Sequence, residues 1–213
     1  MDDLLKLWRA SSDTGFCAGS MGQLFAKRAA PPAIARTTTT AQSAATASGA
    51  QTATFAAGCF WGVELHFQRV PGVLTTAVGY AQGHVQQPTY KQVCSGITGH
   101  TEAVRLTFDP EVLSYGELVE KFWSRRGFDM TQKNGQGNDW GTQYRSGIYT
   151  HDDEQARIAA ESKAARAARG VKVAVEIEPA LAFWPAEAYH QQYLQKGGQD
   201  ASKGATARIR CYG

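Results

Sequence analysis

Hydrophobic and polar positions along this 213-residue chain follow two different periods, which predicts both strands and helices. Residues 52–57 form a short apolar run typical of a buried strand, and residues 73–80 are rich in β-branched side chains. Residues 102–108 and 144–150 show a similar strand pattern. Apolar side chains alternate with polar or small ones over residues 171–178, which predicts a strand with one buried face.

Helical patterns separate these strands. Residues 60–69 carry apolar side chains at the spacing of a helix. Ser114 and Glu117 match a capping box, in which the two side chains satisfy free backbone amides, so we expect a second helix to begin there. A third helix is predicted from Asp152 to Gly170, because acidic residues favour a helix N-terminus and glycine commonly follows a helix end. The side chains expected to face the core are Trp61, Leu65, Phe67, Leu118, Val119, Phe122 and Trp123.

The order of these elements indicates the fold class. Residues 81–101 and 126–141 contain too much glycine and too many polar side chains for element interiors, so we expect loops there. Trp184, Tyr189 and Tyr193 are expected to dock a short helix. The order strand, helix, strand, strand, helix, strand, then a further helix and strand, predicts an α+β protein. Its expected architecture is a two-layer α/β sandwich with a ferredoxin-like core and a mixed sheet.

A change in composition divides the chain into a tail and one domain. Residues 29–51 are mostly Ala, Thr, Ser, Pro and Gln, and such a tract buries too little apolar surface to order itself. We expect residues 1–51 to be a disordered tail or a transit peptide, because their long acid-free stretch contains arginine, although two aspartates at the start argue against a transit peptide. Residues 52–213 form the expected domain, with a mobile C-terminal tail from about residue 197. The acid-free tract is compatible with the chloroplast; the alternative location is the cytoplasm.

Charge and hydropathy exclude two function classes. The net charge of +3 comes mostly from the tail: five Lys and Arg stand against three acids up to Gln51, and 17 against 16 from Thr52 onward. A nucleic-acid interface would need a strong basic stripe, so we expect none. The chain also has no run of the roughly 18–20 apolar residues that a membrane span requires. We expect a monomer that binds neither nucleic acid nor a membrane.

The four cysteines are widely separated, at Cys17, Cys59, Cys94 and Cys211. The absence of a Cys-x-x-Cys pair argues against a structural zinc site, and four cysteines are too few for a disulfide scaffold. This usage fits an intracellular setting with individually reactive thiols. Cys94 is expected to pack as a small buried residue, and no catalytic role is expected for Cys17.

Cys59 lies at the predicted junction between a strand and a helix. Unpaired amides at a helix N-terminus stabilise a thiolate, so we expect the pKa of Cys59 to fall below the free value of about 8.5. Phe60 and Trp61 would wall a small apolar pocket beside the sulfur. The alternative is that Cys59 packs as a small hydrophobic residue and that both aromatic rings belong to the core.

The sequence Gly-Cys-Phe-Trp-Gly at residues 58–62 resembles the signature of the A-type peptide methionine sulfoxide reductases. Further blocks occur in the family's order and spacing, and the similarity covers residues 55–213. The ending at residues 209–213 is similar to plant and green-algal members. The other matching blocks are Val70-Pro71-Gly72-Val73, Val78-Gly79-Tyr80, Pro88-Thr89-Tyr90, Val93-Cys94-Ser95-Gly96, Gly99-His100-Thr101-Glu102, Gln136-Gly137-Asn138-Asp139, Gly141-Thr142-Gln143-Tyr144-Arg145-Ser146 and His190-Gln191-Gln192-Tyr193-Leu194.

The resemblance implies an enzyme that repairs oxidised proteins by reducing methionine S-sulfoxide, protein-bound or free, without a metal or a bound organic cofactor. In the implied mechanism Cys59 attacks the sulfoxide sulfur, and Glu102 protonates the oxygen because burial raises the pKa of a carboxyl group. Tyr90 and Tyr144 match tyrosines whose hydroxyls reach this oxygen. Asp139 matches a polar residue that supports the site.

The resemblance also implies how the thiol is recycled. Phe60 and Trp61 would hold the methyl group of the substrate by burial. Cys59 would be left as a sulfenic acid, which condenses with Cys211, the matching resolving residue, to form a disulfide. Thioredoxin would then reduce this disulfide by thiol exchange, and dithiothreitol would do so in vitro.

Two departures from the family pattern support a rival interpretation. Many relatives carry a second C-terminal cysteine where this chain has Ala205, and residues 126–131 differ from the family's His-Asp-Pro-Thr block. A redox-sensing or methionine-sulfoxide-binding module that keeps the pocket without the cycle is therefore the second hypothesis. A thiol hydrolase with a Cys–His pair lacks support, because His66 is expected on the helix flank and His100 belongs to a family block.

Overall fold

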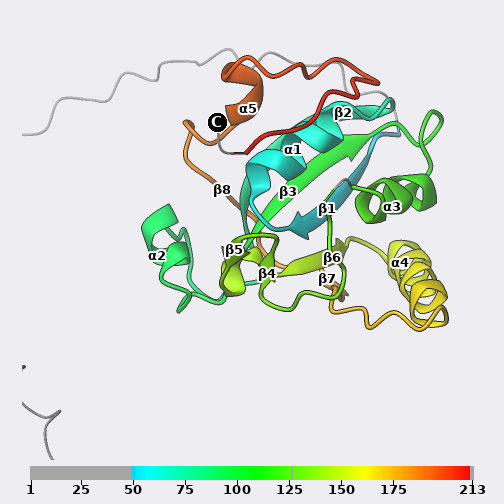
Figure 1. Ribbon diagram of the computed structural model, residues 1–213, viewed down its shortest axis with the longest axis horizontal. Helices are drawn as coiled ribbons and strands as arrows, with labels where there is room; N and C mark the ends of the chain where they lie inside the picture. Colours follow the sequence, from blue (N-terminus) through cyan, green and yellow to red (C-terminus); the bar gives the residue numbers. More distant parts are fainter. Residues whose placement is uncertain (1–48, 126, 212–213) are drawn as a thin grey trace, which may run out of the picture. The chain divides into compact units, whose positions relative to one another are not determined.

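The computed structural model describes residues 49–125 and 127–211 (Figure 1). The predicted N-terminal tail or transit peptide, Cys17 included, lies outside these residues. A six-stranded sheet runs through the described part of the chain. Its strands are β1 (Gln51–Ala57), β2 (Val73–Ala81), β3 (Thr101–Phe108), β6 (Ser146–Thr150), β7 (Glu176–Pro179) and β8 (Trp184–Pro185).

The strand order of this sheet is β7-β6-β1-β3-β2-β8. Strand β1 is antiparallel to both β3 and β6, and β2 is antiparallel to β3. β3 therefore lies between β1 and β2, which is the interleaving of a ferredoxin-like β-α-β-β-α-β unit. β7 joins β6 in parallel and makes the sheet mixed. The predicted α/β sandwich with a ferredoxin-like core and a mixed sheet is confirmed.

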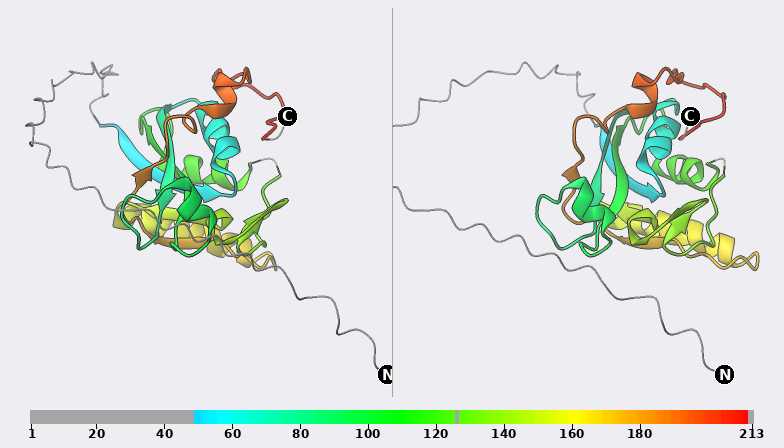
Figure 2. Two further views of the ribbon diagram at one scale, coloured as in Figure 1. Left: turned by 90° about the vertical axis from the view of Figure 1, so that its left-hand side faces the viewer. Right: turned by 60° about the vertical axis from the view of Figure 1, so that its left-hand side comes forward.

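Three longer helices cover one face of the sheet (Figure 1, Figure 2). They are α1 (Phe60–Gln68), α3 (Tyr115–Trp123) and α4 (Asp153–Ala167). α1 packs against β1, β2 and β3, whereas α4 packs against β6, β7 and α3. The smaller elements are α2 (Tyr90–Cys94), the hairpin of β4 (Gly135–Gln136) and β5 (Asp139–Trp140), the 3-10 helix η1 (Thr142–Tyr144) and α5 (Tyr193–Lys196).

The main core lies between the sheet and these helices. Phe55 of β1 stacks on Phe67 of α1 and on Phe122 of α3, with ring centroids 4.9 Å and 5.4 Å apart. Successive strand residues point to opposite faces, so Ala56 belongs to a second, smaller cluster, against which Phe183 packs. Packing on both faces of β1 holds the end of this strand, and with it the start of α1, in a defined position.

Two local expectations are corrected. The alternating pattern predicts a strand over residues 171–178, but the strand begins only at Glu176. The Ala174 N–H donates instead to the carbonyl oxygen of Met130 at 2.8 Å, so the backbone here hydrogen-bonds to the loop that follows α3. Residues 81–101, expected to be a loop, contain α2, which is too short for its periodicity to show in the sequence.

The segment after α5 lies along α1 (Figure 2). The Arg69 guanidinium donates to the carbonyl oxygens of Asp200 and Ala207 at 2.8 Å and 2.6 Å, and the Gly204 N–H donates to the Arg69 carbonyl at 2.7 Å. A mobile tail is expected from about residue 197, and the structure shows this tail docked on α1. Its mobility in solution stays a prediction.

We expect the capping box of α3 to contribute measurably to the free energy of unfolding. Ser114→Ala removes the hydroxyl oxygen that accepts from the Glu117 N–H at 3.3 Å, and should lower the free energy of unfolding by about 1 kcal/mol. Urea denaturation followed by circular dichroism measures the change. Glu117→Gln is the control, because glutamine can make the same reciprocal bond. An equal loss in both variants would contradict the assignment.

Candidate active site

Cys59 occupies the junction between β1 and α1 and is the N-cap residue of α1. The Trp61 N–H donates a hydrogen bond to its sulfur. Gly58 has φ +82°, and a Cβ there would lie 2.6 Å from the Cβ of Gln136, so this turn requires glycine. Cys59 therefore lies where the strand and helix patterns place it.

Cys211 lies next to Cys59, although the two are far apart in the sequence. The Cys59 thiol donates a hydrogen bond to the Cys211 sulfur, and both thiols are free. Gly62 in the first turn of α1 permits this approach, because a Cβ there would lie 2.6 Å from the Cys211 Sγ. The docked tail thus seats its cysteine against the start of α1.

Contact between the two thiols raises the pKa of Cys59, whereas its place at the helix start predicts a lowered pKa. The hydrogen bond to Cys211, burial and the charge of Glu102 raise the pKa of Cys59, and together they outweigh the Trp61 amide, which lowers it. The hydrogen bond from Cys59, assisted by the charge of Arg125, lowers the pKa of Cys211 to about 7. The prediction of a lowered Cys59 pKa is wrong for this arrangement, because the helix start alone does not reveal a second thiol that accepts its hydrogen bond.

Glu102, near the start of β3, is 2% exposed. Its Oε2 accepts a hydrogen bond from the Phe60 N–H at 3.0 Å. Burial raises the pKa of Glu102 to about 8, and the charge of Asp139 acts in the same direction. The carboxyl group therefore holds its proton at neutral pH, beside the first residue of α1.

Two tyrosine hydroxyls and one further carboxylate surround Glu102. Burial raises the pKa of Tyr90 and of Tyr144, and the charge of Glu102 adds to both shifts. The two hydroxyls are therefore neutral hydrogen-bond donors. Asp139, in β5, acts electrostatically on Glu102 and Tyr144. The structure thus brings these four residues together from β3, α2, β5 and η1.

The two aromatic residues after Cys59 take different positions. Phe60 is 1% exposed and belongs to the core. Trp61, expected to face the core, is only partly buried; its ring stacks on Tyr193 with centroids 3.9 Å apart. The Trp61 Nε1–H donates to the Nδ1 of His190 at 3.1 Å. Trp61 therefore forms an edge of the site, held from the C-terminal side of the domain.

Glu187 and His190 contribute to the site but were not expected as functional residues. One Glu187 oxygen accepts from the Tyr80 hydroxyl at 2.7 Å and the other from the Tyr90 N–H at 2.9 Å, so Glu187 fixes the start of α2. The His190 ring lies 4.6 Å from the Tyr90 ring. The only signal in the sequence was that His190 lies in one of the blocks that resemble the family, because the residues around Glu187 and His190 form no motif that indicates a function.

Arg125 points inward, toward the strand that precedes Cys59. Its guanidinium donates to the carbonyl oxygen of Ala57 at 2.7 Å, one residue from the Gly58 turn. Arg126 lies outside the described residues. Arg208 and Arg210 are exposed.

Cys94 is exposed rather than buried, because α2 turns Val93 into the core and leaves the following thiol outside. The Tyr90 hydroxyl hydrogen-bonds to this thiol. His66 lies on the flank of α1, where its Nε2 pairs with the Lys121 carbonyl oxygen at 2.9 Å, so it forms no catalytic pair with Cys59.

Residues 49–125 and 127–211 contain no group of three or more His, Cys, Asp or Glu side chains arranged to hold a metal ion. Within the same ranges, no helix has the length and apolar character needed to cross a membrane.

Comparisons with known proteins agree with one another. A family model described as peptide methionine sulfoxide reductase matches residues 51–210. The peptide methionine sulfoxide reductase of Solanum lycopersicum is 55% identical over 172 residues, covering 78% of this chain and 87% of its own. Peptide methionine sulfoxide reductase A4, chloroplastic, of Arabidopsis thaliana is 53% identical, covering 78% of this chain and 66% of its own. Mxr1 from Saccharomyces cerevisiae in reduced form has a TM-score of 0.66 at 37% identity, covering 71% of this chain and 88% of that chain.

The raised pKa of Glu102 predicts a pH dependence of stability. Between the ordinary pKa of 4.5 and about 8, the folded state holds a proton that the unfolded state has lost, so the free energy of unfolding falls as pH rises through this window. Glu102→Gln removes the titration but keeps an oxygen for the Phe60 N–H. Urea denaturation across this window should show the wild type losing stability relative to the variant. A difference that does not change with pH would contradict the assignment.

Proposed function

Because this chain belongs to the peptide methionine sulfoxide reductase family, we propose that Cys59 reduces methionine S-sulfoxide and that Cys211 recycles it. The observation that carries this proposal is the contact of two free thiols beside a protonated Glu102. A thiol that takes oxygen from a sulfoxide becomes a sulfenic acid, and a neighbouring thiol converts it to a disulfide. The substrates are free methionine sulfoxide and oxidised proteins, so the function is repair.

In the first half-reaction Cys59 attacks the sulfoxide sulfur and methionine is released. Overall R₂S=O and Cys59–SH become R₂S and Cys59–SOH, so the atoms and the two electrons balance. Protonation of the sulfoxide oxygen weakens its bond to sulfur, and Glu102, with a pKa of about 8, has a proton to give at neutral pH. Cys211 must leave the Cys59 thiol for this step, which removes the largest cause of the raised Cys59 pKa and leaves the Trp61 amide in place.

The neighbours of Glu102 complete the site. The Tyr90 and Tyr144 hydroxyls are neutral and would donate to the oxygen on which charge develops, Tyr90 exchanging its bond to the Cys94 thiol for one to the substrate. Asp139 supports them by raising the pKa of Glu102. Trp61 gives the methyl group of the substrate an apolar surface, and Phe60 supports the indole from the core, with ring centroids 6.5 Å apart. The hydrogen bond from Trp61 to His190 sets the indole orientation.

In the second half-reaction the Cys211 thiol attacks the sulfur of the sulfenic acid, and water leaves. The positive charge of Arg125 lowers the pKa of Cys211 and so favours the attacking thiolate. When the tail returns to its docked position next to Cys59, the two sulfurs are close, so the reaction is effectively unimolecular. Thioredoxin then reduces the disulfide by exchange, and dithiothreitol replaces it in vitro. No bound cofactor is required.

The proposal extends to the whole chain. Residues 52–213 are the catalytic domain of a monomer, and residues 1–51 are a tail or a transit peptide. The name of the Arabidopsis thaliana relative supports a chloroplast location, and the cytoplasm is the alternative. Neither nucleic acid nor a membrane is a partner.

Cysteine variants test the two half-reactions. With separate S- and R-sulfoxide substrates, thioredoxin, its reductase and NADPH, we expect turnover of the S-epimer alone. Cys59→Ser should abolish it, because a serine hydroxyl does not replace the attacking thiol. Cys211→Ser should release one equivalent of methionine and then stop. Multiple turnover in Cys59→Ser, or no turnover of wild type even with dithiothreitol, would reject the proposal; the latter would favour the binding or sensing module, which the alanine at position 205 suggests.

Glu102→Gln tests the proton donor. We expect the rate of the first half-reaction to fall by about 10²–10⁴-fold, the usual contribution of a general acid. The wild-type rate should also decline as pH rises through about 8, where Glu102 ionises, whereas the residual rate of the variant should lack this limb. Rapid-quench measurement of methionine release gives both quantities. Tyr144→Phe is the comparison, since it removes one donor but keeps the acid, so its pH limb should persist.

A further inference from the structure

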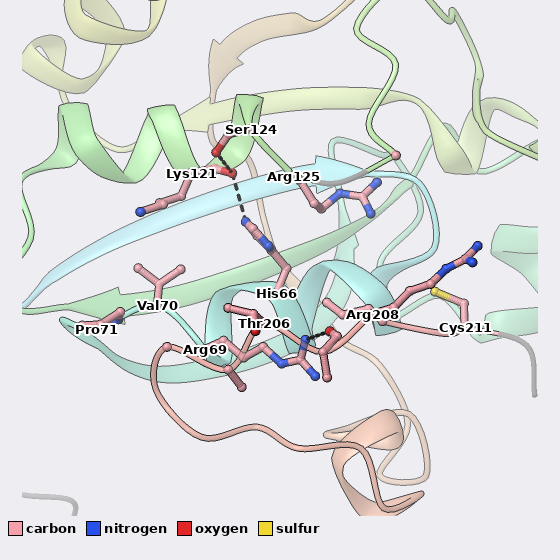
Figure 3. Close-up of a pocket in the computed structure, with 15 residues that line it drawn as sticks. His66, Arg69, Val70, Pro71, Lys121, Ser124, Arg125, Thr206, Arg208 and Cys211 are labelled. Atoms are coloured by element: carbon pink, nitrogen blue, oxygen red, sulfur yellow. Dashed lines mark hydrogen bonds between the residues drawn. The ribbon is translucent and has the colours of Figure 1, made fainter.

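A cavity of about 690 Å³ lies between the docked tail, α1 and the end of α3, and Cys211 is part of its wall (Figure 3). We call this cavity the basic groove. Four cationic side chains line it: Arg69, Lys121, Arg125 and Arg208. Its size falls within the range of small-molecule sites. In Figure 3, Arg125 and Arg208 extend toward the end of the groove that holds Cys211, and Lys121 lies at the other end.

Among the described residues, no ion pair neutralises the charge of this groove. No aspartate or glutamate occurs among the described residues that line it. Arg69 and Arg125 donate to backbone carbonyls, and in the described part of the chain none of the four cations pairs with a carboxylate. Lys121 and Arg208 are exposed, so their charged ends remain available to a ligand. A cleft lined by one sign of charge concentrates ligands of the opposite sign.

We propose that the basic groove binds the carboxylates of a small anionic thiol and places its sulfur next to Cys211. This inference rests on the proposed function, because it concerns the Cys59–Cys211 disulfide. The chain has alanine at position 205, so no second tail cysteine opens that disulfide and an external thiol must do so. Of the two bonded sulfurs, only that of Cys211 belongs to a residue that lines the groove.

The exchange balances in two steps. The thiolate of the ligand attacks the Cys211 sulfur and forms a bond to it, and the Cys59–Cys211 bond breaks. The electron pair of that bond leaves on the Cys59 sulfur, which accepts a hydrogen bond from the Trp61 N–H. A second thiolate attacks the ligand sulfur of the mixed disulfide, and Cys211 leaves. Two thiols are thereby oxidised to one disulfide while both cysteines are reduced, and the two protons of the thiols pass to the cysteines.

The test measures reduction of the preformed disulfide. Enzyme treated with one equivalent of methionine sulfoxide is first shown by mass spectrometry to contain the Cys59–Cys211 disulfide. It is then mixed with mercaptosuccinate, which carries two carboxylates, or with neutral mercaptoethanol, and free cysteines are trapped by alkylation. We expect the double variant Lys121→Gln/Arg208→Gln to lose about tenfold in the rate with mercaptosuccinate and little with mercaptoethanol. For each thiol, the rate with the variant is divided by the rate with the wild type, so the different intrinsic reactivities of the two thiols cancel.

The matched control is Arg169→Gln/Lys172→Gln, which removes the same charge at exposed positions outside the groove. It should leave both rates near those of the wild type, and 0.5 M salt should weaken the wild-type preference for mercaptosuccinate. Equal losses in the two double variants, or no loss with mercaptosuccinate in Lys121→Gln/Arg208→Gln, would overturn the inference. Failure of the disulfide to form in the first stage would instead reject the proposed function.

Discussion

The buried carboxyl of Glu102 joins the centre of the sheet to the first turn of α1 by accepting the Phe60 N–H at 3.0 Å. A helix start leaves several amides without partners, and a buried carboxyl group needs hydrogen bonds, so each group satisfies a need of the other. The same contact places Cys59, one residue before Phe60, next to the acid. The site therefore depends on β3 lying beside β1, which is a property of the sheet order.

The tail adds the second thiol to this framework. Arg69, at the end of α1, holds the tail through two carbonyl oxygens, and Gly62 leaves room for Cys211 in the first turn. This contact raises the pKa of Cys59 and lowers that of Cys211, so under the proposed roles the attacking thiol stays protonated until Cys211 moves away. The basic groove lies behind the same tail, and Cys211 is part of its wall.

Contacts between distant segments account for what the local patterns missed. The Glu187 carboxylate fixes Tyr90 from nearly a hundred residues away, and Arg125 turns inward to a carbonyl of β1. In the local sequence, neither Glu187 nor Arg125 can be distinguished from an ordinary charged surface residue. Residues 171–175 alternate like a strand, yet the Ala174 N–H donates to Met130, in a loop. A period of two indicates which side chains are exposed, but it does not identify the segment to which the backbone hydrogen-bonds.

The sequence by itself determined the helices and most strands, the ferredoxin-like order, the junction that carries Cys59 and the family, since these follow from short-range periodicity, capping chemistry and motifs. Only the tertiary structure decided the titration of the two thiols, the docked course of the tail, the exposure of Cys94 and the basic groove. Burial and the distance between charges control a pKa, and both are set by residues that meet only after folding.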